Sequence, residues 1–237
     1  MTHLLSAFDF PRAVRTARAA LLALGAFGLL AGCTPVGVAI GAGAMAGTAA
    51  LEERGLEQAV RDEADEIGIR KRLIDYSVDT FRRVNVDVYE GRVLLTGIVP
   101  EPDDRVEAVR VAWATDGIVD VVNEVLIGEG VGTIDTSYDI RITTELRADI
   151  TFDADVKAVN YNLQAVGGTL YLFGVAQNEA ELARVEAHAR RIPNVRRIVS
   201  HVLMKDGARR QSLLEALEAE LAKPEAETTD PAPEPTS

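Results

Sequence analysis

The sequence is short of cysteine and of basic residues. Its single cysteine, Cys33, allows no disulfide within one molecule. Lysine and arginine number 25 against 37 aspartates and glutamates, which gives a formal net charge of −12. Binding to nucleic acid needs clustered cations that neutralise phosphates, so no nucleic-acid partner is expected.

Recognisable motifs of enzymes and metal sites are missing as well. The chain has only three histidines and no cysteine besides Cys33, and these residues form no metal-ligand cluster in the sequence. There is no nucleophile elbow, no phosphate-binding glycine loop that opens a helix, and no paired-carboxylate motif in a recognisable frame. We therefore expect no enzyme, no cofactor and no metal.

The N-terminal region has the layout of a secretory signal. Arg12, Arg15 and Arg18 precede the uncharged apolar run 19–30, which is shorter than the ~20 residues of a membrane-spanning helix. Residues 30–33, Leu-Ala-Gly-Cys, resemble the lipobox of bacterial lipoproteins. The resemblance implies that residues 1–32 are removed and that Cys33 carries the acyl anchor. In such lipoproteins an aspartate after the cysteine commonly retains the protein at the inner membrane, so with Thr34 at this position the resemblance implies the periplasmic face of the outer membrane.

Two further segments lie outside the body of the chain. Residues 33–60 begin with a stretch of Gly, Ala and other small residues, which is interpreted either as a flexible tether or as a small-residue helix that lies on the bilayer or self-associates. A short leucine-containing helix is predicted over 210–222, and the acidic, proline-rich tail 223–237 is expected to be disordered.

An internal repeat gives the architecture. An offset of 77 residues aligns 65–127 with 142–204 without a gap. Each copy opens with apolar residues at helical spacing, and these predicted core positions are Ile69, Leu73 and Tyr76 in the first copy and Ile142, Leu146 and Ile150 in the second.

In each copy the apolar period then changes to two, which predicts a β-hairpin with its turn at Glu90-Gly91 or Gly167-Gly168. A helix that ends near Gly117 or Asn194 follows, and then a closing strand. The fold class is therefore α+β, with tandem α-β-β-α-β sandwiches over 61–128 and 137–206. Each has a three-stranded sheet and two helices on its one apolar face. The connection between the sandwiches is short, so they are expected to pack together.

The hairpin and closing strand carry a family motif. It reads Val86-x-Val88-x-x-Gly91-x-Val93-x-Leu95-x-Gly97-x-Val99, followed by Gly117-Ile118-x-x-Val121-x-Asn123-x-Val125. Each repeat thereby resembles a BON domain, and a lipobox followed by two such domains is similar to dual-BON outer-membrane lipoproteins. The resemblance implies binding of anionic phospholipid, a role in outer-membrane integrity, and lipid contact through the first helix of the second domain.

Residues of that helix are the phospholipid-binding candidates: Tyr138, Arg141, Thr144, Glu145, Arg147 and Ala148. Relatives place a tryptophan at the position of Arg141 and a lysine at that of Glu145, but arginines can still attract phosphate. The alternative is that these are ordinary solvent-facing helix residues.

Two other surfaces are candidates. Arginines concentrate late in the second domain, at Arg190, Arg191, Arg196 and Arg197. They are interpreted either as a basic surface for anionic headgroups or as an ordinary solvated strand edge. In the first domain, Val106, Val109 and Trp113 share a helix face opposite the expected core positions. That face is predicted to contact another envelope protein or the neighbouring domain, unless Trp113 simply lies in the core.

Overall fold

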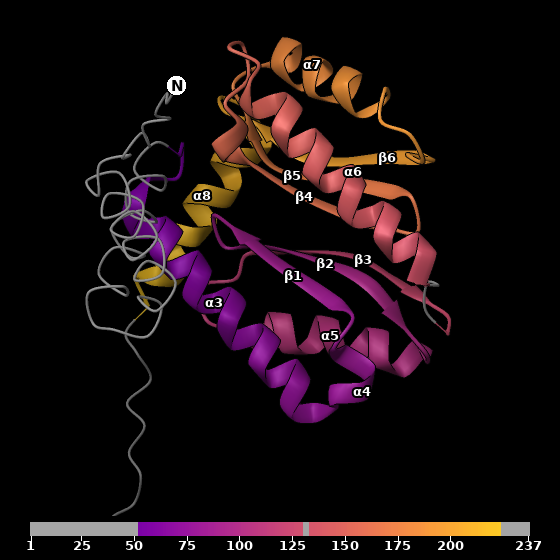
Figure 1. Cartoon of the computed structure of the whole chain (residues 1–237). Helices are drawn as coiled ribbons and strands as arrows, with labels where there is room; N and C mark the ends of the chain where they lie inside the picture. The colour runs from indigo at the N-terminus through magenta and orange to yellow at the C-terminus, as the bar shows by residue number, and fades with distance from the viewer. Residues whose placement is uncertain (1–51, 130–132, 224–237) are drawn as a thin grey trace, which may run out of the picture. The chain divides into compact units, whose positions relative to one another are not determined.

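The computed structural model describes residues 52–129 and 133–223 (Figure 1). The predicted signal peptide, Cys33, most of the predicted tether and almost all of the acidic tail lie outside these residues. The first domain consists of α3 (Gly55–Tyr76), α4 (Val78–Phe81), β1 (Val84–Tyr89), β2 (Arg92–Val99), α5 (Pro102–Trp113) and β3 (Asp120–Ile127). The second consists of α6 (Thr133–Thr151), the 3-10 turn η2 (Ala158–Asn160), β4 (Tyr161–Val166), β5 (Thr169–Ala176), α7 (Glu179–Ala189) and β6 (Arg197–Met204), and α8 (Ala208–Leu221) follows it.

Both sheets have the same topology. The strand orders are β1-β2-β3 and β4-β5-β6. The hairpin strands are antiparallel, with Val86 opposite Leu95, and the closing strand is parallel to the middle one, with Val125 opposite Gly97. Because parallel neighbours need a crossover, α5 and α7 each connect the second strand to the third. The predicted α-β-β-α-β order is confirmed.

A buried aspartate fixes each hairpin turn. Asp62 accepts hydrogen bonds from the main-chain N–H groups of Glu90 and Gly91 at 2.8 and 3.0 Å. Both turn residues have positive φ, 54° and 67°, which suits a two-residue hairpin turn. Asp139 does the same for Gly167 and Gly168 at 2.7 and 2.8 Å. The repeat therefore extends back to the first helix of each domain.

Each domain has its own apolar core between its sheet and its helices. Ile142, Leu146 and Ile150 are fully buried as predicted, and so are Ile69 and Leu73. The prediction was wrong for Tyr76, which is 62% exposed. Tyr76 is the last residue of α3, and its ring contacts the edge of Phe81.

The opposite faces of the two sheets pack against each other. A third apolar cluster joins Tyr89 and Leu94 of the first domain to Val166, Tyr171, Phe173 and Val175 of the second. The sequence predicted that the domains pack together but gave each sheet only one apolar face. Each sheet has two, because helices cover one face and the other sheet covers the second (Figure 1).

Two hydrogen bonds across this interface join equivalent positions of the two repeats. Gln164 Nε2 donates to Asp87 Oδ2 at 2.8 Å, and His201 Nε2 lies 2.9 Å from Glu124 Oε1. Both pairs are separated by 77 residues, which is the repeat offset. The interface is thus close to two-fold symmetric, like that of a homodimer whose halves lie on one chain.

The helix after the second domain packs on the first. Leu217 of α8 is buried, and a methyl group added at Gly91 would lie 2.8 Å from its Cδ1. Arg210 donates to both carboxylate oxygens of Glu90, at 2.6 and 2.9 Å. The helix predicted over 210–222 therefore exists and covers the hairpin end of the first domain.

The predicted tether is too long at its C-terminal end. Residues 55–60 form the first turns of α3. Just before them, Glu53 contacts Lys157, Lys205 and Gln177 at 2.9 to 3.0 Å. Leu56, Ala59 and Val60 lie at helical spacing in these turns, which was the signal in the sequence that assignment to the tether missed.

Candidate functional site

The first helix of the second domain presents most of its predicted residues to solvent. Tyr138, Arg141, Thr144 and Ala148 are exposed. Glu145 is partly exposed and lies 3.3 Å from Arg141, so part of the arginine's charge is offset locally. These residues lie at spacings of three and four, which places them on one side of α6.

Arg147 lies apart from this surface. Its guanidinium donates to the carbonyl oxygens of Ala158 and Tyr161 at 2.8 and 2.6 Å. Burial lowers its pKa, and Asp87 opposes that shift. The residue therefore attaches α6 to the start of β4, which is a structural role and not the phosphate contact predicted from sequence.

Sequence reasoning missed two apolar side chains on this helix surface. Ile140 is 63% exposed, and Phe152, directly after the last residue of α6, is 88% exposed. Both are apolar residues that do not share the helical spacing of the buried residues Ile142, Leu146 and Ile150. This mismatch was the signal in the sequence that could have identified them as exposed. They give α6 apolar groups at both ends of its exposed side.

The four basic candidates lie at the hairpin end of the second domain. Arg190 and Arg191 follow α7, Arg196 precedes β6 and Arg197 opens it, and all four are exposed. Arg190 pairs with Glu186, and Arg191 contacts His188 Nδ1 at 2.6 Å. Neither contact removes these side chains from solvent.

The turn of the second hairpin brings both candidate sets together. Gly168 donates to Asp139, next to Tyr138, and its carbonyl accepts from the main-chain N–H of Arg196 at 2.8 Å. The start of α6 and the start of β6 therefore meet at the same turn. We call the surface formed by Tyr138, Arg141, Arg190, Arg191, Arg196 and Arg197 the basic end.

Other arginines in the second domain and in α8 form ion pairs that connect parts of the fold. Arg184 lies 2.8 Å from Asp155. Arg209 contacts Asp120 and Arg210 contacts Glu90, both in the first domain. The arginine concentration seen in the sequence therefore divides into a structural group and the basic end.

The predicted interface face of α5 is only partly exposed. Val106 and Trp113 are 67% and 52% exposed, whereas Val109 packs against the core of the first domain. Trp113 is thus not a core residue. The prediction that Val109 belongs to this exposed face was wrong.

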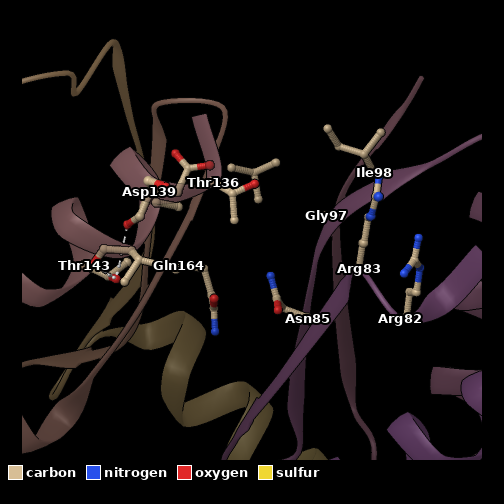
Figure 2. Close-up of a pocket in the computed structure, with 13 residues that line it drawn as sticks. Arg82, Arg83, Asn85, Gly97, Ile98, Thr136, Asp139, Thr143 and Gln164 are labelled. Atoms are coloured by element: carbon tan, nitrogen blue, oxygen red, sulfur yellow. Dashed lines mark hydrogen bonds between the residues drawn. The ribbon is translucent and has the colours of Figure 1, made fainter. Parts of the chain in front are cut away.

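A cavity of about 520 Å³ lies between the domains. Figure 2 shows Arg82, Arg83 and Asn85 on the side of the first domain, and Thr136, Asp139, Thr143 and Gln164 on the side of the second. Sequence reasoning missed this cavity because its walls come from different domains. Within the described part of the chain, no group of histidine, cysteine, aspartate and glutamate could hold a metal, and no helix is long and apolar enough to span a membrane.

A family model for the BON domain matches residues 62–129 and 138–206. The chain belongs to the BON-domain family. These matches cover the two observed sandwiches nearly end to end, which makes it a tandem BON protein.

Relatives support the outer-membrane lipoprotein branch of the family. The chain is 32% identical over 162 residues to outer membrane lipoprotein DolP of Haemophilus influenzae, covering 68% of this chain and 83% of the relative. It is 37% identical over 147 residues to an uncharacterized protein in the gshII 5' region of Anaplasma centrale, covering 62% of this chain and 96% of the relative. It is 30% identical to the 21 kDa hemolysin of Actinobacillus pleuropneumoniae, covering 51% of this chain and 63% of the relative. The protein is thus a tandem BON-domain relative of outer membrane lipoprotein DolP.

Proposed function

We propose that this BON protein is anchored through an acylated Cys33 to the periplasmic face of the outer membrane, binds anionic phospholipid through its second domain, and supports outer-membrane integrity without enzymatic activity. The lipobox at 30–33 and the relative named outer membrane lipoprotein support the location. The anchor would hold the domains at high effective concentration near the bilayer, so weak headgroup contacts suffice.

The basic end is the observation that carries the proposal. It places exposed arginines next to Tyr138 in a protein whose net charge is −12. Each cation close to an anionic membrane contributes about 1 kcal/mol of attraction. Arginine also binds phosphate oxygens through two N–H groups at once.

The apolar groups along α6 suit an interfacial position. Tyr138 and Ile140 are exposed close to Arg141 in the chain, and Phe152 is exposed just beyond the C-terminal end of α6. Aromatic and apolar side chains at the headgroup boundary bury surface, while neighbouring arginines remain with the phosphates. Such binding is shallow and reversible.

Vesicle flotation tests the proposal. The mature chain from residue 33, with Cys33→Ser so that no acyl group is attached, is mixed with phosphatidylglycerol-containing or pure phosphatidylcholine vesicles. We expect flotation with the anionic vesicles only, and loss of flotation as salt rises from 50 to 500 mM, because the attraction is screened. Equal flotation with both vesicles would contradict anionic lipid binding.

A second function is supported by the α5 face. Val106 and Trp113 are large, apolar and exposed, as in protein interfaces whose centre is an aromatic residue. Under this alternative the chain is a non-enzymatic adaptor that docks onto another envelope protein. In vivo crosslinking from position 106 that captures one discrete envelope protein, and that Trp113→Ala abolishes, would support it; crosslinks to lipid alone would oppose it.

A further inference from the structure

The cavity between the domains has a cationic wall. Arg82 and Arg83 lie between α4 and β1, and both are exposed. Neither forms an ion pair or a side-chain hydrogen bond with any residue in 52–129 or 133–223. The corresponding positions of the second domain are Val159 and Asn160, so this pair of cations belongs to the first repeat.

The acidic and amide groups of the opposite wall already have partners. Asp139 accepts from Gly167 and Gly168 with its two carboxylate oxygens, at 2.7 and 2.8 Å. Gln164 donates to Asp87 at 2.8 Å. The two arginines are thus the cavity's uncommitted charged groups, which favours an anionic occupant.

Apolar side chains complete the cavity. Ile98, Ile140, Ala165 and Val166 line it together with the polar groups. Ile140 also reaches solvent on α6, and Val166 precedes the hairpin turn of the basic end. Ile140 therefore belongs both to the cavity lining and to the exposed surface of α6, and the cavity's 520 Å³ lies within the range of small-ligand sites, about 300–1,000 Å³.

We propose that this cavity binds the phosphodiester headgroup of an anionic phospholipid, with Arg82 and Arg83 donating to the phosphate oxygens and Ile98, Ile140 and Val166 contacting the glycerol and the start of the acyl chains. The inference rests on the proposed function and deepens it, because it assigns a share of headgroup binding to the first domain. A single lipid held between the domains would also tie the two repeats together.

Native mass spectrometry of the full lipidated chain, released from a nonionic detergent, tests this assignment. The probes are dihexanoyl phosphatidylglycerol, dihexanoyl phosphatidylcholine and inorganic phosphate. We expect one bound phosphatidylglycerol per chain. Arg82→Glu with Arg83→Glu should weaken this binding about tenfold or more, since two cations near the phosphate are reversed.

A matched control is Arg61→Glu with Arg110→Glu, which makes the same charge change on exposed helix surfaces of the first domain away from the cavity. It should retain lipid binding. Arg82→Gln with Arg83→Gln gives a milder pair, and a circular dichroism melt of each variant checks that it is folded.

The outcomes separate this inference from the proposed function. If phosphatidylglycerol binds equally to the wild type and to both cavity variants, while reversal of Arg190, Arg191, Arg196 and Arg197 abolishes binding, the cavity is not the site and the basic end alone binds lipid. If inorganic phosphate binds as tightly as phosphatidylglycerol, the cavity is a phosphate site and not a lipid site. If the wild type binds no anionic lipid in this assay or in flotation, the proposed function itself fails.

Discussion

The hairpin ends of the two BON domains have the same fold and opposite surroundings. In the first domain α8 covers the turn with Leu217, and Arg210 pairs with Glu90 of the turn. In the second domain the equivalent turn lies among exposed arginines. The positions that hold Trp113, Ala114, Val119 and Asp120 in the first copy hold Arg190, Arg191, Arg196 and Arg197 in the second. The hairpin end of the first domain is therefore covered by packing, whereas that of the second domain is exposed and basic.

The largest effect is expected from the aspartates that hold the turns. Asp62 is fully buried, binds two turn amides and pairs with Arg54 at 2.8 Å. Asp62→Ala should reduce the free energy of unfolding by about 3–5 kcal/mol, because it leaves two buried amides unpaired and removes one of the two carboxylates that pair with the largely buried Arg54. Asp139→Ala, which removes only amide contacts, should reduce it by about 2–3 kcal/mol. Urea unfolding followed by circular dichroism measures both, and equal losses would show that Arg54 contributes nothing.

The second largest effect is expected from the packing of α8 on the first domain. Leu217→Ala should destabilise the protein by about 2–4 kcal/mol, since it removes a buried side chain from the contact with the Gly91 turn. Leu221→Ala, at an exposed position of the same helix, is the control and should change stability by less than about 1 kcal/mol. Hydrogen exchange should show faster opening of the Glu90-Gly91 turn only in the first variant. Unchanged protection would mean that α8 does not stabilise this end.

A pH dependence sharpens the comparison of equivalent positions in the interface. Asp87 faces its repeat counterpart Gln164, and burial, reinforced by Glu66, raises its pKa from 3.8 to about 7. The folded protein then retains a proton that the unfolded chain releases between about pH 4 and 7, so this residue makes the free energy of unfolding fall as pH rises through that window.

Asp87→Asn keeps an acceptor for Gln164 and removes the charge. It should raise stability at pH 8 by about 1–2 kcal/mol and flatten the fall between pH 4 and 7. Thermal melts of both proteins at pH 4, 6 and 8 provide the measurement. A variant that is less stable than the wild type at pH 8 would show that the carboxylate is stabilising in the interface.

The smallest effect is expected at Arg141. Its charge is partly offset by Glu145, so Arg141→Glu should weaken binding to anionic vesicles only about three- to fivefold, near 1 kcal/mol for one cation. Glu145→Gln, which frees the arginine, should strengthen binding slightly. Flotation titrations compare the two variants, and a complete loss of binding in Arg141→Glu would show that, within the basic end, Arg141 on α6 and not the arginines at 190–197 makes the main contact.

Local pattern was sufficient for most of the fold. The alternation in β1 and the Gly167-Gly168 turn predicted the hairpins, and helical spacing identified Ile142, Leu146 and Ile150 as core. The second buried face was also present in β5, whose run Thr-Leu-Tyr-Leu-Phe-Gly-Val-Ala is almost continuously apolar. Such a run is typical of a strand that is covered on both sides.

The rest depended on contacts distant in sequence. The role of Arg147 follows from the carbonyls of Ala158 and Tyr161, which only the folded domain brings to it. Likewise, the cover that α8 gives to Gly91 and the cavity beside Arg82 join residues of separate segments. Composition could reveal a local excess of arginine, but it could not separate the arginines that pair with the first domain from those that stay exposed to solvent.

The central claim is that the open, basic end of the second domain binds anionic phospholipid. The direct test is vesicle flotation of the Cys33→Ser mature chain with Arg190, Arg191, Arg196 and Arg197 all changed to glutamate. The matched control reverses Arg61, Arg70, Arg105 and Arg110 of the first domain, for the same change in net charge. We predict that the first variant loses binding to phosphatidylglycerol vesicles by about a hundredfold or more, at about 1 kcal/mol per cation, while the control stays within about tenfold of the wild type. Equal losses in both variants would contradict the claim, because binding would then follow net charge and not this surface.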